Sequence, residues 1–323
     1  MVLVLSEETV RTHLDLPGLV DVVGDALAKQ AAGDVERPDR PHFPVGTGLA
    51  GDEPTGTAIT MPAYIHGEKQ YATKLVGVHE GNADRGYPTI HAQIALTDAQ
   101  TGRPKAYMAG TTITKARTGC VGALAVRELA PETTTLGIIG AGAQARWQTR
   151  AIATVSALDD VRIYSPSDSR IECADDLMSE GIQARAVDTP EAAITSADAV
   201  VTTTTATEPV FPADALDPDT LVVAVGAFTA EMQELPPAVL NSSTAVFADV
   251  PSEAAKTGDV LASDLGVDDL LPFGDLVSGR HSPSNAAGTP VVVSVGSATL
   301  DAAAGAAIYR RAVKVGDGTT TPL

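Results

Sequence analysis

The chain has 323 residues, of which 44% are hydrophobic. This length and composition suit one large domain or two of ordinary size, and they exclude a small disulfide-stapled scaffold and a disordered tail. Asp and Glu number 41 against 22 Lys and Arg, so the formal net charge is −19. The acidic residues are spread along the chain without a basic stripe, which argues against a nucleic-acid partner.

Other features of the composition bear on the cellular environment. Lysine supplies only seven of the 22 basic residues, and aromatic residues make up 4% of the chain. Together with the acid excess, these values favour a cytoplasm of high salt. Cys120 and Cys173 are too few and too scattered for a disulfide framework or a CxxC metal site, and no cluster has metal-ligand spacing. Because the sequence lacks a signal-peptide pattern and a long apolar run, we expect a soluble cytoplasmic protein without metal or membrane contact.

The first part of the chain predicts a helix followed by antiparallel strands. Ser6-Glu-Glu-Thr predicts the start of a helix that runs to about Gln30, and residues 33–44 are rich in turn residues. Alternating apolar and polar residues predict strands at 57–64, 70–78, 89–98 and 106–109. Residues 113–129 have helical apolar spacing, which Pro131 ends.

Beyond Pro131, buried strands alternate with helices, which is typical of a parallel α/β sheet. The predicted strands are 134–139, 161–164, 184–187, 199–203, 221–225 and 245–248, with a further apolar run at 290–295. An Ala-rich helix at 298–312 is expected to return to the first domain. We therefore predict an α/β protein in which a Rossmann domain, residues 116–294, is inserted in an α+β domain formed by residues 1–115 and 295–323.

A glycine-rich motif at residues 136–145 is the strongest local signal. In its GxGxxA pattern, Gly140 permits a tight turn, Gly142 lets the backbone approach a pyrophosphate, and Ala145 lets helix pack on strand. The N-terminus of the following helix supplies amide hydrogens and a positive dipole end. The pattern alone also fits tight packing at a βα turn, but the flanking strand and helix favour a dinucleotide site.

The segment after the next strand bears on the choice of dinucleotide. Ser165 stands where an acidic residue would accept the ribose hydroxyls of NAD. Ser165, Ser167 and Arg170 can instead hold a 2′-phosphate. Asp168 can still serve NAD if the loop folds back, and the segment also fits a solvated turn. The sequence slightly favours NADP(H) over NAD(H), and dual use stays open.

Three basic residues of the first part are candidates for a substrate anchor. Lys74 lies in a predicted strand, where a lysine is costly to bury unless it meets an anion. Arg40 lies in a turn-rich stretch and Arg117 in a predicted helix. Each also has a simpler explanation: Arg40 as a surface loop residue, Lys74 as an edge-strand charge and Arg117 as a helix-surface charge.

The chain resembles the ornithine cyclodeaminase/mu-crystallin family over nearly its whole length. The matching motifs are Arg40 with Pro44, Met61-Pro-Ala-Tyr64, Thr73-Lys74-Leu-Val76, Pro88-Thr89, residues 113–118, residues 140–144, Glu253 with Gly258-Asp259, and Ser294-Val-Gly296. The resemblance implies a homodimer whose N-terminal domain binds substrate and mediates dimerisation, while its Rossmann domain binds the cofactor.

The resemblance also implies roles for individual residues. Arg40, Lys74 and Arg117 would clamp the carboxylate of an amino or imino acid, and Lys74 would also donate a proton. Glu253 matches a glutamate proposed as the acid in ketimine reductases, although it also fits a helix-start glutamate. His79 and His91 can shuttle protons too. The implied dinucleotide contacts are Thr89, Arg117, Thr118, Gly140, Gly142, Ala143, Gln144, Ser165, Ser167, Arg170, Thr205, Val225, Gly226, Ala227, Phe228, Ser294 and Gly296.

One departure from the family pattern bears on the reaction. Ornithine cyclodeaminases and the archaeal alanine dehydrogenases of the family carry an Asp where this chain has Phe228. Phenylalanine cannot take a proton or hold a cation, but it suits the apolar body of a cyclic imino acid. We therefore expect an NAD(P)H-dependent reductase of Δ1-pyrroline-2-carboxylate or Δ1-piperideine-2-carboxylate. An alanine dehydrogenase, an ornithine cyclodeaminase and a non-enzymatic binding protein are the alternatives. Ala109 also replaces an acidic residue that many members carry.

Overall fold

The computed structural model describes residues 1–49, 51–282 and 288–322. The chain folds into two compact units. The first comprises Met1–Asp15, Gly33–Arg117 and Ala298–Leu323, and the second comprises Leu16–Ala32 and Thr118–Ser297. Most of the second unit is thus inserted between parts of the first. Residues 16–32, which the sequence predicts in the first domain, group with the second unit.

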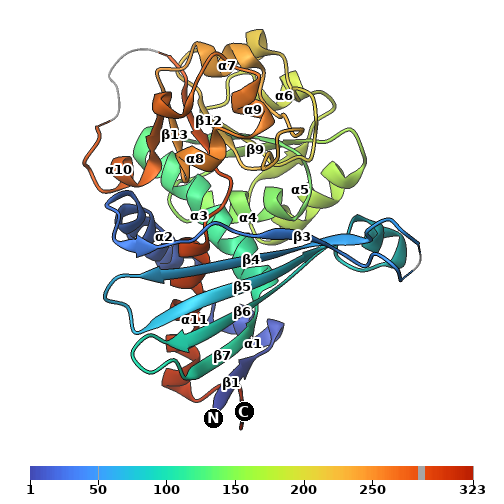
Figure 1. Ribbon diagram of the computed structural model, residues 1–323. Coiled ribbons are helices and arrows are strands. Elements are labelled where there is room, and N and C mark those ends of the chain that lie inside the picture. The colour runs from blue at the N-terminus through green and yellow to red at the C-terminus, as the bar shows by residue number, and fades with distance from the viewer. Residues whose placement is uncertain (50, 283–287, 323) are drawn as a thin grey trace. The chain divides into compact units, whose positions relative to one another are not determined.

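The first unit is built on an eight-stranded sheet in the order β16-β1-β7-β6-β5-β4-β2, with β3 also paired to β4. Its strands are β1 (Val2–Leu5), β2 (Val35–Glu36), β3 (His42–Val45), β4 (Gly56–Ile65), β5 (Gln70–Val78), β6 (Ile90–Asp98), β7 (Pro104–Ala109) and β16 (Thr319–Thr321). Apart from the parallel pair β1 and β7, neighbouring strands are antiparallel. The helix α11 (Ala298–Val315) lies along one face of this sheet (Figure 1).

The helix expected from Ser6 to Gln30 is two helices, α1 (Glu7–His13) and α2 (Leu16–Ala31). Ser6 caps α1 by accepting the Thr9 N–H, and Leu14 is extended, which ends the helix. Pro17 lies in the first turn of α2, where its missing N–H costs nothing. The expectation of one helix was therefore wrong at this break.

The second unit contains a parallel eight-stranded sheet in the order β10-β9-β8-β11-β12-β15-β13-β14. Its strands are β8 (Thr135–Ile139), β9 (Asp160–Tyr164), β10 (Ala184–Ala186), β11 (Ala199–Thr202), β12 (Leu221–Ala224), β13 (Ala245–Ala248), β14 (Leu270–Pro272) and β15 (Pro290–Val293). From β8 the sheet continues through β9 and β10 on one side, and the later strands are added on the other side, beginning with β11. The position between β8 and β11 is therefore the switch point of a doubly wound sheet. The predicted α/β fold class with a Rossmann-type parallel sheet is confirmed.

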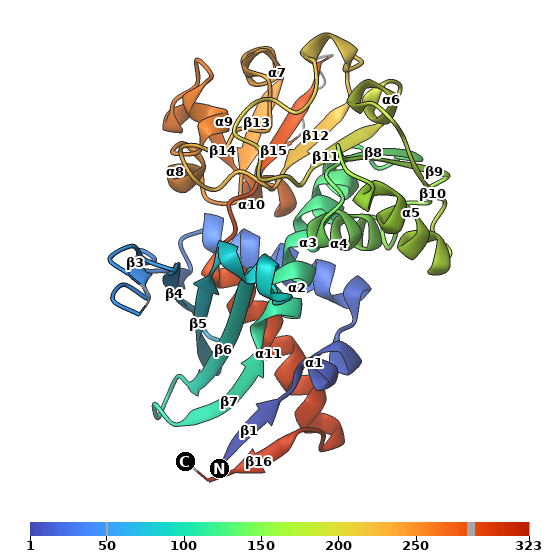
Figure 2. The same cartoon turned by 90° about the vertical axis from the view of Figure 1, so that its right-hand side faces the viewer.

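Helices lie on both faces of the parallel sheet (Figures 1 and 2). The helices of the second unit are α2, the part of α3 (Gly110–Leu129) that follows Arg117, α4 (Ala143–Ile152), α5 (Ser169–Ser179), α6 (Pro190–Ile194), α7 (Pro237–Asn241), α8 (Pro251–Ala254), α9 (Gly258–Leu261) and α10 (Phe273–Val277). The strands supply a valine-rich core because a parallel sheet is buried on both faces. Among the described residues, none of the helices is long and apolar enough to cross a membrane.

Candidate functional site

The glycine-rich turn lies between β8 and α4, at the carboxyl end of the parallel strands. Gly140 has a φ of +106°, and a Cβ there would lie 2.6 Å from the Thr203 hydroxyl oxygen. Gly142 precedes α4 with an extended backbone and is exposed, and a Cβ there would meet no atom within 4 Å. The open space beside Gly142 and the amides of the first turn of α4 fit the pyrophosphate of a dinucleotide.

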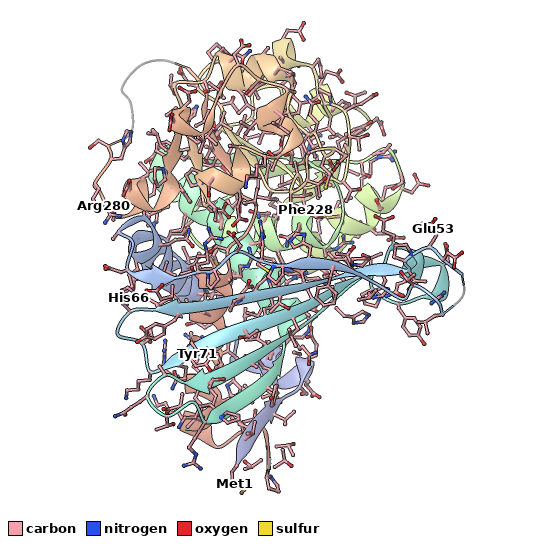
Figure 3. The ribbon with its side chains drawn as sticks, viewed as in Figure 1. Met1, Glu53, His66, Tyr71, Phe228 and Arg280 are labelled. Carbon is pink, nitrogen blue, oxygen red and sulfur yellow. The ribbon has the colours of Figure 1, made fainter. Side chains whose placement is uncertain are left out.

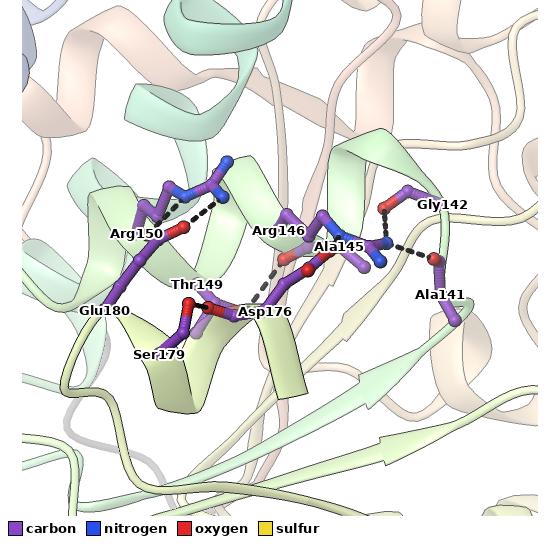
Figure 4. A network of polar contacts seen from close by, with 9 residues as sticks. All are labelled: Ala141, Gly142, Ala145, Arg146, Thr149, Arg150, Asp176, Ser179 and Glu180. Carbon is purple, nitrogen blue, oxygen red and sulfur yellow. Dashed lines mark hydrogen bonds and ion pairs between the residues drawn. The ribbon is translucent and has the colours of Figure 1, made fainter. Parts of the chain in front are cut away.

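Ion pairs fix α4 on α5 (Figure 4). The Arg146 Nε lies 2.6 Å from Asp176, and Arg150 binds Glu180 through two nitrogens. Arg146 also donates to the Ala141 carbonyl oxygen at 2.7 Å, so the same side chain holds the glycine turn. The glycine turn is therefore held in its conformation by Arg146, which was not among the predicted site residues.

The segment after β9 carries the residues predicted to choose the dinucleotide. Ser167 and Ser169 share a hydroxyl hydrogen bond of 2.7 Å. Arg170 donates to the Ser167 carbonyl oxygen at 2.9 Å, and its guanidinium also faces Asp188 at 3.3 Å. Ser165 is half-buried at the end of β9. The structure thus brings Ser165, Ser167 and Arg170 together, with an acidic neighbour that competes for the arginine.

Two loops at the same edge of the sheet follow β11 and β12. Thr205 is exposed in the first loop. In the second loop Ala227 is buried and Phe228 is 49% exposed. The backbone of the first loop approaches the glycine turn, because the Thr203 N–H donates to the Ile139 carbonyl oxygen at 2.8 Å.

A pair of buried carboxylates that the sequence did not predict lies under these loops. Glu234 accepts hydrogen bonds from Thr202, Thr204 and Gly226, and Asp259 accepts two from backbone amides. Both side chains are fully buried. The signal for them in the sequence is a carboxylate next to apolar residues, as in Glu234-Leu and Asp259-Val.

Ser294 and Gly296 follow β15, and both are bound to Asp249. The Ser294 hydroxyl donates to Asp249 at 2.7 Å, and the Gly296 N–H donates to the same oxygen at 2.8 Å. Ser294 is only 2% exposed. In this arrangement Ser294 shapes the loop through Asp249. A direct hydrogen bond from its hydroxyl to a dinucleotide would require that contact to be exchanged.

The first unit holds two of the predicted cations on a shared carboxylate. Lys74, on β5, places its Nζ 2.5 Å from Asp301 Oδ2, and the Arg117 Nε, on α3, lies 3.0 Å from Asp301 Oδ1. All three side chains are buried. Since β5 lies between β4 and β6, Lys74 is an interior residue and the edge-strand explanation is excluded. Asp301 comes from α11 and was missed, although an Asp inside an Ala-rich helix is a visible signal.

The charges of this cluster influence each other. Burial lowers the pKa of Lys74 to about 8; Asp301 opposes this shift, while Arg117 and Arg40 add to it. Arg40 is half-buried, and its charge is the smallest of the named influences on Lys74. Burial opposes ionisation of Asp301, but Arg117 and Lys74 outweigh it and lower the pKa of that carboxyl. The cluster therefore carries more positive than negative charge and can bind an anion.

The remaining candidates lie in less specific settings. Glu253 is half-buried on the short helix α8, and Thr89 is exposed just before β6. Thr118 is buried on α3, and its carbonyl oxygen accepts from Gln148 of α4 at 3.0 Å. His91 is exposed and His79 is half-buried. Gln144 is half-buried, and its Oε1 has no hydrogen-bond partner among the described residues.

In the described ranges, no group of three or more His, Cys, Asp or Glu could hold a metal ion. Cys120 and Cys173 are both buried.

Comparisons with known proteins identify relatives of the chain. The model of the ornithine cyclodeaminase/mu-crystallin family matches residues 1–316. A Δ1-pyrroline-2-carboxylate reductase of Bacillus cereus is 31% identical over 87% of this chain and 89% of its own length. The structure of Thermococcus litoralis Δ1-pyrroline-2-carboxylate reductase with NADH and L-proline superposes with a TM-score of 0.92, at 26% identity over 99% of this chain and 100% of that one. An archaeal alanine dehydrogenase dimer with bound NAD superposes with a TM-score of 0.91, at 26% identity over 100% and 99% of the two chains.

Proposed function

Because the chain belongs to the ornithine cyclodeaminase/mu-crystallin family, we propose that it is an NAD(P)H-dependent reductase of cyclic imino acids. Its substrates would be Δ1-pyrroline-2-carboxylate or Δ1-piperideine-2-carboxylate, and its products L-proline or L-pipecolate. The observation that carries the proposal is the buried cation cluster in which Lys74 and Arg117 flank Asp301. Its excess positive charge suits a carboxylate, which every one of these substrates carries.

The cluster would bind the substrate carboxylate and fix its plane. Arg117 contacts Asp301 through Nε, so its terminal nitrogens can form the bidentate contact that a carboxylate accepts. Lys74 would add an ammonium, and Arg40 would close the clamp. Holding the carboxylate in this way orients the neighbouring C2 atom, which lowers the entropic part of the barrier.

A proton is needed as well as a hydride. When bound, the reduced nicotinamide supplies the hydride that adds to C2 of the C=N bond. The ring nitrogen must be cationic for C2 to accept it, so an acid has to protonate or keep protonated that nitrogen. Glu253 is our candidate for this acid. Lys74, whose pKa is lowered to about 8 by burial, is a second candidate because it can release a proton near neutral pH.

Phe228 favours reduction over cyclodeamination. Its side chain is 49% exposed at the end of β12, so it is available to an incoming ring. A phenyl group offers apolar contact to a pyrroline or piperideine ring, and it cannot accept a proton from the amines of ornithine. An alanine dehydrogenase activity is the second candidate, since the archaeal alanine dehydrogenase shares this fold over the whole chain.

The dinucleotide would bind at the glycine turn, with Gly142, Ala143 and Gln144 at the pyrophosphate. We propose a slight preference for NADP(H), with Ser165 and Arg170 next to the 2′-phosphate. The contact between Arg170 and Asp188 reduces this preference without removing it. Arg170→Ala should therefore weaken NADPH binding and leave NADH binding unchanged, and an equal loss for both cofactors would contradict the assignment.

We propose that two copies of the chain pair through the uncovered face of the first sheet. A row of uncharged residues crosses five strands on the face opposite Lys74: Val4, Tyr107, Ala95, Thr73 and Pro62. Tyr71, which Figure 3 labels, and Leu75 add exposed apolar area on β5. The mass in sedimentation equilibrium should be about twice 33.0 kDa. A double replacement of Leu75 and Tyr107 by Asp should give monomers, whereas Ile171→Asp on α5 should not.

The experiment that tests the reaction follows NADH and NADPH absorbance after substrate addition. Oxidation on addition of Δ1-pyrroline-2-carboxylate, with L-proline formed in equal amount, is the expected result. Oxidation that requires pyruvate and ammonia would identify an alanine dehydrogenase instead. Release of ammonia from L-ornithine would overturn the role given to Phe228, and cofactor binding without any turnover would indicate a binding protein.

A further inference from the structure

Glu234 joins the ends of two neighbouring parallel strands. Its Oε1 accepts a hydrogen bond from the Thr204 N–H at 2.5 Å, beyond β11. Its Oε2 accepts from the Thr202 hydroxyl at 2.9 Å and from the Gly226 N–H at 2.8 Å, beyond β12. One buried carboxylate thus holds together the two loops that carry Thr205 and residues 225–228.

Asp259 fixes the backbone that carries Glu234. Its Oδ1 accepts from the Glu234 and Leu235 N–H groups, both at 2.7 Å. Its Oδ2 is buried and has no hydrogen-bond partner among the described residues. A buried carboxylate oxygen without a donor is costly when charged. This cost favours a state in which one of the two carboxyls, Glu234 or Asp259, is protonated.

The two carboxyls interact and titrate near neutral pH. Burial raises the pKa of Glu234 to about 7, and the charge of Asp259 adds to the shift while the three hydrogen bonds oppose it. Burial likewise raises the pKa of Asp259 to about 6. The groups that face Glu234 are Thr202 and Thr204 from the β11 side, Gly226 from the β12 side and Asp259 from α9, and only Asp259 is titratable.

Protonation changes what Glu234 can hold. A carboxylate accepts hydrogen bonds from all three donors, whereas a neutral carboxyl has an O–H group that itself needs an acceptor. The Thr202 hydroxyl is the one contact that can reverse and accept it, which puts the proton on Oε2. The Gly226 N–H then faces a hydroxyl oxygen, a weaker acceptor than a carboxylate oxygen. The same protonation therefore weakens the attachment of the β12 loop, while the Thr204 N–H keeps a carbonyl oxygen as its acceptor.

We propose that Glu234 is a positioning residue: only while it is ionised does it hold the β11 and β12 loops in the arrangement that binds the dinucleotide. Asp259 sets the pH at which Glu234 takes up a proton and its contact with the β12 loop weakens. The proposal rests on the proposed function in so far as these loops bind the nicotinamide cofactor. It makes cofactor affinity a function of pH even without substrate.

The test measures the dissociation constant of NADH and of NADPH by fluorescence titration from pH 5.5 to 8.5, with no imine present. Wild-type protein should bind about five- to tenfold more weakly at the acidic end. Glu234→Gln should bind weakly at every pH and lose the pH dependence, because the amide leaves the N–H of either Thr204 or Gly226 without an acceptor. Asp259→Asn keeps an oxygen for both backbone donors, so it should retain tight binding and move the midpoint to lower pH.

Amide resonances separate this proposal from the proposed function. The Thr204 and Gly226 signals should shift together with one midpoint in wild-type protein and stay constant in Glu234→Gln. Identical pH profiles in wild type and Glu234→Gln would overturn the positioning role, even if the imine is reduced. Conversely, a protein that shows the paired amide titration but reduces no imine would overturn the proposed function alone.

Discussion

Asp301 is the residue on which the cation cluster depends. It is the shared partner of Lys74 and Arg117, and all three are buried, so its removal leaves two positive charges in the interior without an anion. Asp301→Asn should therefore lower the free energy of unfolding by about 3–5 kcal/mol, less if Lys74 gives up its proton. It should also reduce kcat/KM for the imine, because the clamp loses its geometry.

A surface ion pair supplies the matched control for this replacement. Asp15 binds Arg311, which lies on the same helix as Asp301, and both partners are partly exposed. Asp15→Asn should cost less than about 1 kcal/mol and leave turnover unchanged. Chemical denaturation and steady-state kinetics measure both quantities. Equal effects of the two replacements would contradict the role given to Asp301.

Lys74 gives the reaction a pH dependence of its own. Since burial lowers its pKa to about 8, the ammonium loses its proton as the pH rises through that value. The substrate carboxylate then loses one cation, so kcat/KM for the imine should fall on the alkaline side of pH 8. The dissociation constant of the cofactor should stay constant over the same range, and a kcat/KM that is flat up to pH 10 would exclude Lys74 from binding.

At the scale of the elements, the glycine turn before α4 offers a substitution that should weaken cofactor binding without lowering stability. A Cβ at Gly142 meets no protein atom within 4 Å, and the φ of −79° is one that alanine adopts readily. Gly142→Ala should thus leave the thermal midpoint unchanged or slightly raised. It should weaken cofactor binding by about tenfold or more, because the methyl group occupies the space of the pyrophosphate.

Gly266→Ala is a control for this change within the same unit. Its Cβ would lie 3.7 Å from Asp269, an ordinary contact. Calorimetric titration with NADH should give the same affinity as wild type. Should Gly142→Ala also bind the cofactor normally, the dinucleotide would have to approach the chain elsewhere.

Some elements of the fold could be predicted from the sequence and others could not. Seven strands of the parallel sheet were predicted as short apolar runs between helices, and the GxGxxA motif identifies the turn at Gly140. The three-residue edge strand β14 was not predicted. Strand β3 was not, since Pro44 and the polar residues around it resemble a turn. Proline is tolerated there because β3 pairs with β4 alone.

The sites were predictable in proportion to how local their signals are. Gly140 and Gly142 lie in one motif, whereas the pairing of Lys74 with Asp301 joins residues 227 positions apart. Glu234 and Asp259 are 25 positions apart in sequence and meet only because loops from several strands converge. A carboxylate among apolar residues, such as Asp301, is visible in the sequence, but periodicity within a segment does not show which distant residue it contacts.

At the scale of the whole molecule, we expect the net charge to make stability depend on salt. A formal charge of −19 makes the folded chain repel itself, and added salt screens that repulsion. The thermal midpoint should therefore rise by several degrees between 0.1 and 2 M KCl. Near pH 4.5, the isoelectric point, the same salt step should have a much smaller effect. Differential scanning calorimetry gives both values, and a midpoint indifferent to KCl at pH 7 would argue against adaptation to high salt.

The distance along the chain between Lys74 and Asp301 also constrains how the protein is made. During synthesis the ribosome adds β5 long before α11, so a nascent chain holds a lysine that belongs in the interior while its anion does not yet exist. The first unit can reach its final packing only after residue 301 has left the exit tunnel. Premature termination upstream of α11 would accordingly yield a first unit that cannot fold completely. Chaperones and proteases would then bind or degrade this product, even where the preceding segments have folded.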